Sequence, residues 1–291
     1  AAQSASNGVS LSGAVTINTI TNETRASADG VVLKSGGAIA LSASDLSTIE
    51  SLAGAVGFSL STAGVGVAVA YNEIGNTTRA ALEDALVEDQ TGETVNALSL
   101  TATNTSTIKS ASVAGGLAST FGGAGSASTN FSDQTRTTAE IVDSDVAAAE
   151  ANVTVTATDT SLIESLAGGV GLGLSAGFGA AVAVNDIGNV TLARVSGKKT
   201  ADGVDVAGVV ISADSLATIK TASVGVGAGV KVGVGGSVAV NLISSDTRAL
   251  IENGAVIEAR DDVAVLAEAD DRISVLAGAA GIGLAAAGVG A

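Results

Sequence analysis

Large and small apolar residues alternate along one stretch of this chain, residues 49–72, and the pattern returns in every later part of the sequence. From Leu52 to Leu60 the large side chains share one face while Ala, Gly and Ser occupy the other, and the alternation resumes from Val65 to Asn72. A period of two is typical of a β-strand, because successive side chains point to opposite faces. Gly at every second position also disfavours a transmembrane helix. The stretch therefore predicts two strands joined by a tight turn.

This stretch is one copy of a repeat. We call the copies limbs, and successive limbs begin 54 to 59 residues apart, at residues 49–72, 108–130, 163–185, 219–241 and 273–291. Each complete limb begins with Ile and ends with Asn, and its length hardly varies, whereas the connecting segments vary more. Self-similarity at a fixed period predicts a solenoid or array instead of an ordinary globular core. We therefore treat residues 1–291 as a single repetitive segment of about five repeats, and we expect it to belong to a longer chain or filament.

The segments between the limbs carry turn and strand signals of their own. Dipeptides such as Asp29-Gly30 and Asn253-Gly254 precede alternating runs rich in Val, Ile and Thr, for example residues 38–44. Gly after Asp or Asn favours a turn, and alternating β-branched residues favour a strand. The whole repeat is therefore expected to consist of strands and turns.

One position discriminates between two all-β arrangements. The residue after the first Ile of each limb alternates in sign, as Glu50, Lys109, Glu164 and Lys220. In a parallel solenoid these residues would lie about 4.8 Å apart on neighbouring strands, where opposite charges attract and like charges repel. In an antiparallel meander of long strands they would be two strands apart. The alternation favours an all-β, repetitive parallel β-solenoid with about 55 residues per coil, and the meander is the alternative.

Two further sets of equivalent polar residues are expected to form ladders along such a stack. An amide carries both a donor and an acceptor, so stacked amides can hydrogen-bond from one repeat to the next. The first set precedes each polar connection: Asn18, Asn72, Asn130, Asn185 and Asn241. The second set follows six residues later: Thr24, Thr78, Thr191 and Thr247. The alternative for the Asn residues is a simple turn role.

Composition limits the chemistry that the chain can perform. Its 291 residues include 38 Gly but no Pro, Cys, Met, Trp or His, and only four Phe and one Tyr. A core made of Ala, Val, Leu and Ile must be thin, with closely spaced backbones. Without His or Cys, nucleophilic Ser/His/Asp and Cys/His sites and ordinary zinc sites are excluded. We therefore expect no enzyme activity, no cofactor and no small-molecule substrate.

Charge limits the partners. The net charge of −16 argues against nucleic acid and anionic membrane surfaces. Acidic residues cluster at 83–93 and 261–271, which we interpret as solvated loops, with calcium binding as the alternative. The glycine-rich nonapeptide of calcium-binding β-rolls and the EF-hand loop are both missing. A polysaccharide-active enzyme that uses paired carboxylates on a β-helix is a further alternative.

The recurring pattern also resembles a known kind of protein. Its elements are Val-x-Val-x-Ala, then Ser-x-Ile-x-Ser-x-Ala-Gly-Gly-Val-Gly, then Gly-Val-Ala-Val-Asn-x-Ile and Thr-Arg-Ala, and they recur over residues 1–291. This style of repeat resembles very large bacterial exoproteins, the leukotoxin-type filamentous adhesins and filamentous-haemagglutinin-like proteins. The resemblance implies a secreted or surface-displayed β-solenoid shaft used in adhesion or cell–cell contact, and it carries no catalytic or ligand residues.

We therefore expect a structural role, as a shaft or filament segment of an extracellular bacterial surface adhesin or surface fibre. The expected partners are further copies of the chain, end to end or side by side, and a host or neighbouring-cell surface. The alternative is a membrane-inserting, pore-forming β-hairpin protein, since each strand of a limb has the length of about nine residues that crosses a bilayer.

Overall fold

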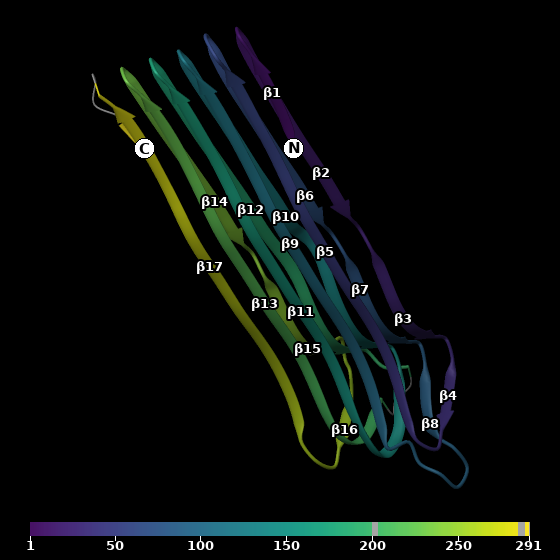
Figure 1. Cartoon of the computed structure of the whole chain (residues 1–291). Helices are drawn as coiled ribbons and strands as arrows, with labels where there is room; N and C mark the ends of the chain where they lie inside the picture. The colour runs from purple at the N-terminus through teal and green to yellow at the C-terminus, as the bar shows by residue number, and fades with distance from the viewer. Residues whose placement is uncertain (200–202, 285–288, 291) are drawn as a thin grey trace.

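The computed structural model describes residues 1–199, 203–284 and 289–290, so the end of the fifth limb lies partly outside the described residues. The described part of the chain is built of strands and turns, in a long and flat stack (Figure 1). No helix within it is long and apolar enough to cross a membrane. The expectation of an all-β chain is confirmed.

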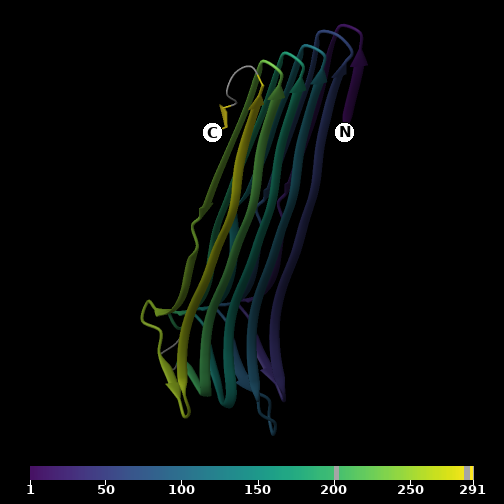
Figure 2. The same cartoon turned by 60° about the vertical axis from the view of Figure 1, so that its left-hand side comes forward.

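Two sheets form the stack, and tight turns join them at one end (Figure 2). The main strands of sheet A, in spatial order, are β1 (Ala2–Ser6), β5 (Ala38–Ser59), β9 (Ala97–Ala118), β11 (Asp145–Gly173), β13 (Val204–Gly229) and β17 (Val263–Gly283). Short strands extend this sheet: β4 (Val32–Ser35), β8 (Leu86–Asp89) and β16 (Ile257–Ala259).

Sheet B runs alongside sheet A in the same order. Its main strands are β2 (Val9–Ile20), β6 (Ala63–Ile74), β10 (Phe121–Val142), β12 (Ala176–Ser196), β14 (Val232–Ile243) and β18 (Val289–Gly290). Its short strands are β3 (Glu23–Asp29), β7 (Thr77–Glu83) and β15 (Asp246–Glu252). Each repeat thus contributes to both sheets before the chain moves on.

Every pair of these strands is parallel, so the antiparallel meander is wrong. Equivalent residues of successive repeats face each other: Ile49 pairs with Ile108, and Ile163 pairs with Ile219. The arrangement is consistent with a parallel β-solenoid. Parallel pairing at this sequence separation requires a long crossover, which the second sheet provides.

The limb and the alternating run before it form one strand. The sequence suggests two separate pieces around residues 38–44 and 49–60, but β5 continues without interruption from Ala38 to Ser59. Polar residues at Asp45 and Ser47 interrupt the apolar pattern without breaking the alternation, because their side chains also point inward. Register shifts occur at two places after the second limb: between Ser132 and Thr135, where an extra residue is absorbed as a bulge, and between Ala148 and Asn152.

A conventional apolar core lies at the end of the stack away from the turns. Its buried side chains come from both sheets and include Leu82, Leu98, Leu100, Ile141 and Ile211. A separate row of buried Ile residues, Ile49, Ile108, Ile163 and Ile219, lies nearer the middle of the strands. Large side chains hold the sheets apart in this half of the molecule.

The turn-proximal half has a different interior. Here the inward-facing residues are Gly, Ala and Ser, and the two backbones approach each other directly. A methyl group placed on Gly57, Gly171 or Gly225 would collide with a backbone carbonyl oxygen of the facing strand. The small-residue faces of the limbs therefore pack against the other sheet of the same chain, closer than the usual spacing of about 10 Å.

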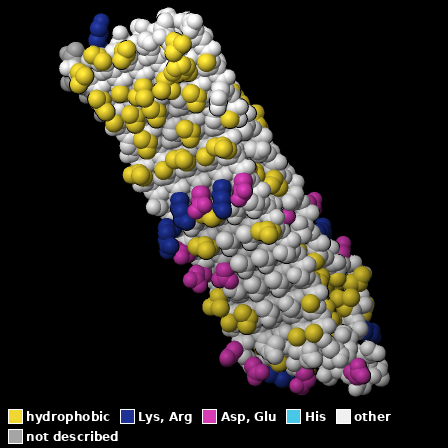
Figure 3. Space-filling view, viewed as in Figure 1, with side chains coloured by type: hydrophobic (Ala, Val, Ile, Leu, Met, Phe, Trp, Pro, Cys, Tyr) yellow, Lys and Arg dark blue, Asp and Glu magenta, His cyan; other side chains and the backbone are white. Residues whose placement is uncertain are grey.

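The large apolar residues of the limbs consequently point outward. Leu52 is 67% exposed, and Val15 on sheet B is equally exposed. On the face of sheet A such residues gather in the half of the molecule near the turns (Figure 3). A row of alternating basic and acidic side chains crosses the same face below them (Figure 3). In this half of the molecule the large apolar side chains therefore lie on the outer surface, and the interior contains only small residues.

Candidate functional site

The predicted Asn residues lie side by side between the two sheets. Each Nδ2 donates to the Oδ1 of the next Asn, over 2.8 Å from Asn18 to Asn72, 2.8 Å from Asn72 to Asn130, 2.7 Å from Asn130 to Asn185 and 2.8 Å from Asn185 to Asn241. Asn72, Asn130 and Asn185 are fully buried. Side-chain hydroxyls of sheet A complete the row, since Asn72 also donates to Ser110 and Asn185 to Thr221. The amides link every repeat to the next.

Asn185→Ala is expected to destabilise the fold by about 1–3 kcal/mol, because it leaves the Asn130 amide donor without its Asn acceptor. Asn185→Asp should be worse near neutral pH, since it adds a buried charge. Asn18→Ala is the matched control, because Asn18 is only half-buried and makes one such bond. Urea unfolding measures all three variants, and equal effects at the two positions would contradict a cooperative ladder.

The predicted Thr residues also lie in one row. Thr24 pairs with Thr78, and Thr191 pairs with Thr247. Thr137 joins the row between Thr78 and Thr191, although the bulge in its repeat hides it in the sequence. In the described structure the hydroxyls of Thr78, Thr191 and Thr247 have no hydrogen-bond partner. The Thr residues are therefore aligned by the register of the strands, and their hydroxyls do not form hydrogen bonds from one repeat to the next.

A second buried polar cluster is centred on Asp159 and was not predicted. Its carboxylate accepts hydrogen bonds from Asn104 (2.8 Å), Thr137 (3.2 Å), Ser161 (3.0 Å) and Asn189 (2.5 Å). All five side chains are buried. Burial raises the pKa of the Asp159 carboxyl, and the hydrogen bonds oppose that shift only in part.

The sequence does carry a signal for this cluster. Asp45, Asn104 and Asp159 each stand four residues before the first Ile of a limb, and the register aligns them. Asp45 repeats the arrangement at the first limb, where Asn76 and Ser47 donate to its carboxylate over 2.6 and 2.7 Å. The occurrence of both Asp and Asn at equivalent positions of successive repeats therefore indicates a buried carboxylate that accepts hydrogen bonds from amide side chains.

The Arg of the Thr-Arg-Ala signature belongs to a row of ion pairs along sheet B. Arg79 contacts both Glu83 and Glu140, and Arg194 contacts Glu140 over 2.7 Å and Glu252 over 3.1 Å. Glu140 is buried between its two arginines. The guanidinium of Arg79 is the main cause of the lowered pKa of the Glu83 carboxyl.

Several acidic residues considered for calcium already have cationic partners. Besides Glu83, Glu88 contacts Lys34 over 2.7 Å and Asp84 contacts Lys199 over 3.2 Å. Among residues 1–199, 203–284 and 289–290, no group of three or more acidic side chains is placed to hold a metal ion.

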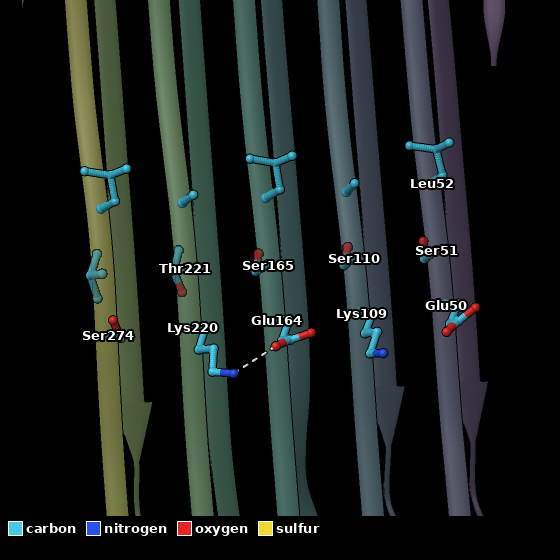
Figure 4. Close-up of a pocket in the computed structure, with 15 residues that line it drawn as sticks. Glu50, Ser51, Leu52, Lys109, Ser110, Glu164, Ser165, Lys220, Thr221 and Ser274 are labelled. Atoms are coloured by element: carbon cyan, nitrogen blue, oxygen red, sulfur yellow. Dashed lines mark hydrogen bonds and ion pairs between the residues drawn. The ribbon is translucent and has the colours of Figure 1, made fainter.

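The alternating charges form a row on the outer face of sheet A (Figure 4). Glu50 is paired in register with Lys109, Lys109 with Glu164, and Glu164 with Lys220. Lys220 Nζ lies 3.1 Å from Glu164 Oε1. Above this row runs an open groove of about 730 Å³ that crosses all five repeats, lined on its far side by Leu52, Ala111, Leu166, Ala222 and Leu276. A second groove of about 540 Å³ lies nearer the turns.

Comparison of the chain with protein-family models, with curated proteins and with solved structures finds no match. The functional argument therefore rests on the ladders inside the stack and on its outer faces.

Proposed function

We propose that this chain is a shaft segment of an extracellular bacterial surface adhesin or surface fibre, built as a parallel β-solenoid with about 55 residues per coil. Its work is mechanical: it holds a rod of constant cross-section and separates whatever lies at the two ends. Attachment to a host or neighbouring-cell surface, and association with further copies, belong to the same proposal. It includes no catalytic step.

The continuity of bonding along the stack carries this proposal. Even the exposed turns are linked, since Phe121 N donates to Thr62 O, Ser175 N to Thr120 O and Val230 N to Leu174 O, each over 3.0 Å. The Asn ladder and the parallel sheets run in the same direction. Neighbouring repeats therefore support each other over their whole width, which is what a rod of many equal units requires.

Insertion of extra repeats tests the proposal. Residues 108–218 comprise two repeats, and they preserve the alternation from Lys109 to Glu164. Four additional copies of this segment should extend the particle by about 38 Å across the strands, at about 4.8 Å per coil, with no change in its dimension along the strands. Small-angle X-ray scattering and electron microscopy measure both dimensions. A particle that grows along the strands, or that collapses instead of growing across them, would contradict a shaft.

The location of the protein needs its own experiment. Antibodies raised against the purified segment should label intact, unpermeabilised source cells in immunogold microscopy, because a surface shaft is accessible from outside. Labelling that appears only after permeabilisation would overturn the extracellular assignment.

A further inference from the structure

The outer face of sheet A carries a two-repeat alternation in size as well as in charge. Directly above the charged row, large and small side chains alternate along the stack: Leu52, Ala111, Leu166 and Ala222. The next outward row alternates in the opposite sense: Gly54, Val113, Gly168 and Val224. The large members of both rows stay exposed, since Leu52 in the first row is 67% exposed and Val113 in the second is 41% exposed. The face is therefore a pattern of knobs and holes above a row of alternating charges.

We infer that this face binds the same face of a second copy of the chain, related by a twofold axis that runs parallel to the strands and between the second and third repeats. The inference rests on the proposed shaft and names its lateral partner. A twofold axis in this direction keeps each row level with the same row of the partner, so charges meet charges and apolar residues meet apolar residues. It also reverses the order of the repeats, so the first repeat faces the fourth and the second faces the third.

Charge complementarity follows from this symmetry. Glu50 faces Lys220 of the second copy, and Lys109 faces Glu164, so all four contacts in the row join opposite charges. A twofold axis placed on a repeat instead of between repeats would set Lys109 against itself or Glu164 against itself. The alternating row thus selects one register out of the neighbouring ones.

The apolar rows are complementary under the same operation. Leu52 faces Ala222 and Leu166 faces Ala111, so each large side chain enters the space above a small one. In the next row Val113 faces Gly168 and Val224 faces Gly54. The three rows therefore agree on an axis between repeats, and the axis between the second and third is the one that brings all four charged positions into contact. A face covered by lipid or left in water would not require this agreement.

The available area is sufficient for a specific contact. Four repeats spaced at about 4.8 Å and nine residues at about 3.3 Å, from Glu50 to Phe58, give a flat area of roughly 600 Å² on each copy. The two outermost rows in this area are apolar but do not alternate strictly in size, since Leu117 would face Leu172. The pair would bury about 1,200 Å² in total, which reaches the range of specific interfaces. Lipid is the competing occupant, but the alternation in size and in charge along the face favours a protein surface of matching pattern.

Filling the holes tests the inference against general stickiness. The variant Ala111→Leu with Ala222→Leu makes the face more apolar but leaves large side chains facing large ones, so self-association should weaken at least about tenfold. A fourfold variant that also carries Leu52→Ala and Leu166→Ala exchanges knobs for holes, and it should associate like the wild type. Ala180→Leu, on the outer face of sheet B, is the control and should change nothing. Sedimentation equilibrium measures all of these.

Charge reversal provides a second, independent readout. Lys109→Glu with Lys220→Glu gives an acidic row, and Glu50→Lys with Glu164→Lys gives a basic row. Each variant alone should remain monomeric, and an equimolar mixture should form the heterodimer. Circular dichroism confirms that each variant is folded before it is compared.

Three results would overturn the inference: stronger association of the filled variant, unchanged association of the two charge variants, or a wild-type monomer that cosediments with phosphatidylcholine vesicles. The last result would assign the face to lipid. None of them changes the lengthening of the rod on insertion of repeats, so failure of this interface is distinguishable from failure of the shaft.

Discussion

Gly225→Ala should destabilise the protein by about 3 kcal/mol or more, although it adds a single methyl group. The methyl group would collide with the carbonyl oxygens of Gly236 and Gly179, which belong to the facing sheet. Backbone atoms cannot rotate away as a side chain can, so the two sheets must separate along several repeats. Urea unfolding followed by circular dichroism gives the change in the free energy of unfolding.

Gly236→Ala is the matched control for this prediction. It lies in the facing strand of the same repeat, but its missing side chain points outward, where nothing lies within 4 Å. The added methyl group should leave stability unchanged or raise it slightly, because Ala restricts the unfolded chain more than Gly does. If both variants lose the same stability, the close contact between the sheets is not what the glycines provide.

Asp159→Ala should cost about 2 kcal/mol or more, because four buried donors lose their acceptor at once. Asn104 and Asn189 keep other partners, Ser106 and Ser161. Asp214→Ala is the control, since Asp214 stands one repeat away, is half-buried and accepts one hydrogen bond from Ser212. Chemical unfolding at neutral pH compares them, and equal losses at both positions would contradict the role of the cluster.

The raised pKa of the same carboxyl predicts the sign of a pH dependence. Its folded pKa is raised above the ordinary value of 3.8, so the folded state holds the proton more tightly than the unfolded state. The part of the stability that is linked to protonation of this group is therefore fully present below pH 3.8 and is lost as the pH rises through the folded pKa, while the hydrogen bonds to the carboxylate remain. Asp159→Asn removes the titration. The difference in unfolding free energy between wild type and Asp159→Asn should thus shift in favour of the wild type on acidification, and a constant difference would show that no such shift exists.

The architecture was predictable because the repeat constrains it at every position. Alternation at residues 49–72 predicts strands, and the opposite charges at Glu50 and Lys109 make sense only if neighbouring repeats are adjacent and parallel. Both inferences use the ordinary period of a strand and the spacing of a sheet. Neither inference depends on which side chains contact each other, so both could be made from the sequence alone.

The partners of individual side chains were less accessible to sequence reasoning. The sequence predicts a thin core with closely spaced backbones but does not say which segments face each other. The contact between Gly225 and the carbonyl oxygen of Gly236 shows that each limb packs against the second sheet of the same chain. Thr137 was missed because one extra residue between Ser132 and Thr135 moves it out of step. Asp159 was missed because its donors come from two sheets and from several repeats, a convergence that no single stretch of sequence displays.

The spacing of the parallel partners sets the order in which the molecule can fold. Amides that bond to each other in the Asn ladder are separated by 54, 58, 55 and 56 residues along the chain. The first pairing of two repeats must therefore close a long loop, at a cost in chain entropy, before any bond between repeats can form. This makes the start of folding slow. Each later repeat closes a loop of the same length, but it joins a finished edge and gains a complete row of bonds. Adding a repeat to the edge of already folded repeats is consequently faster than pairing the first two. The repeats should therefore fold one after another from a single nucleus, as a crystal grows by adding layers.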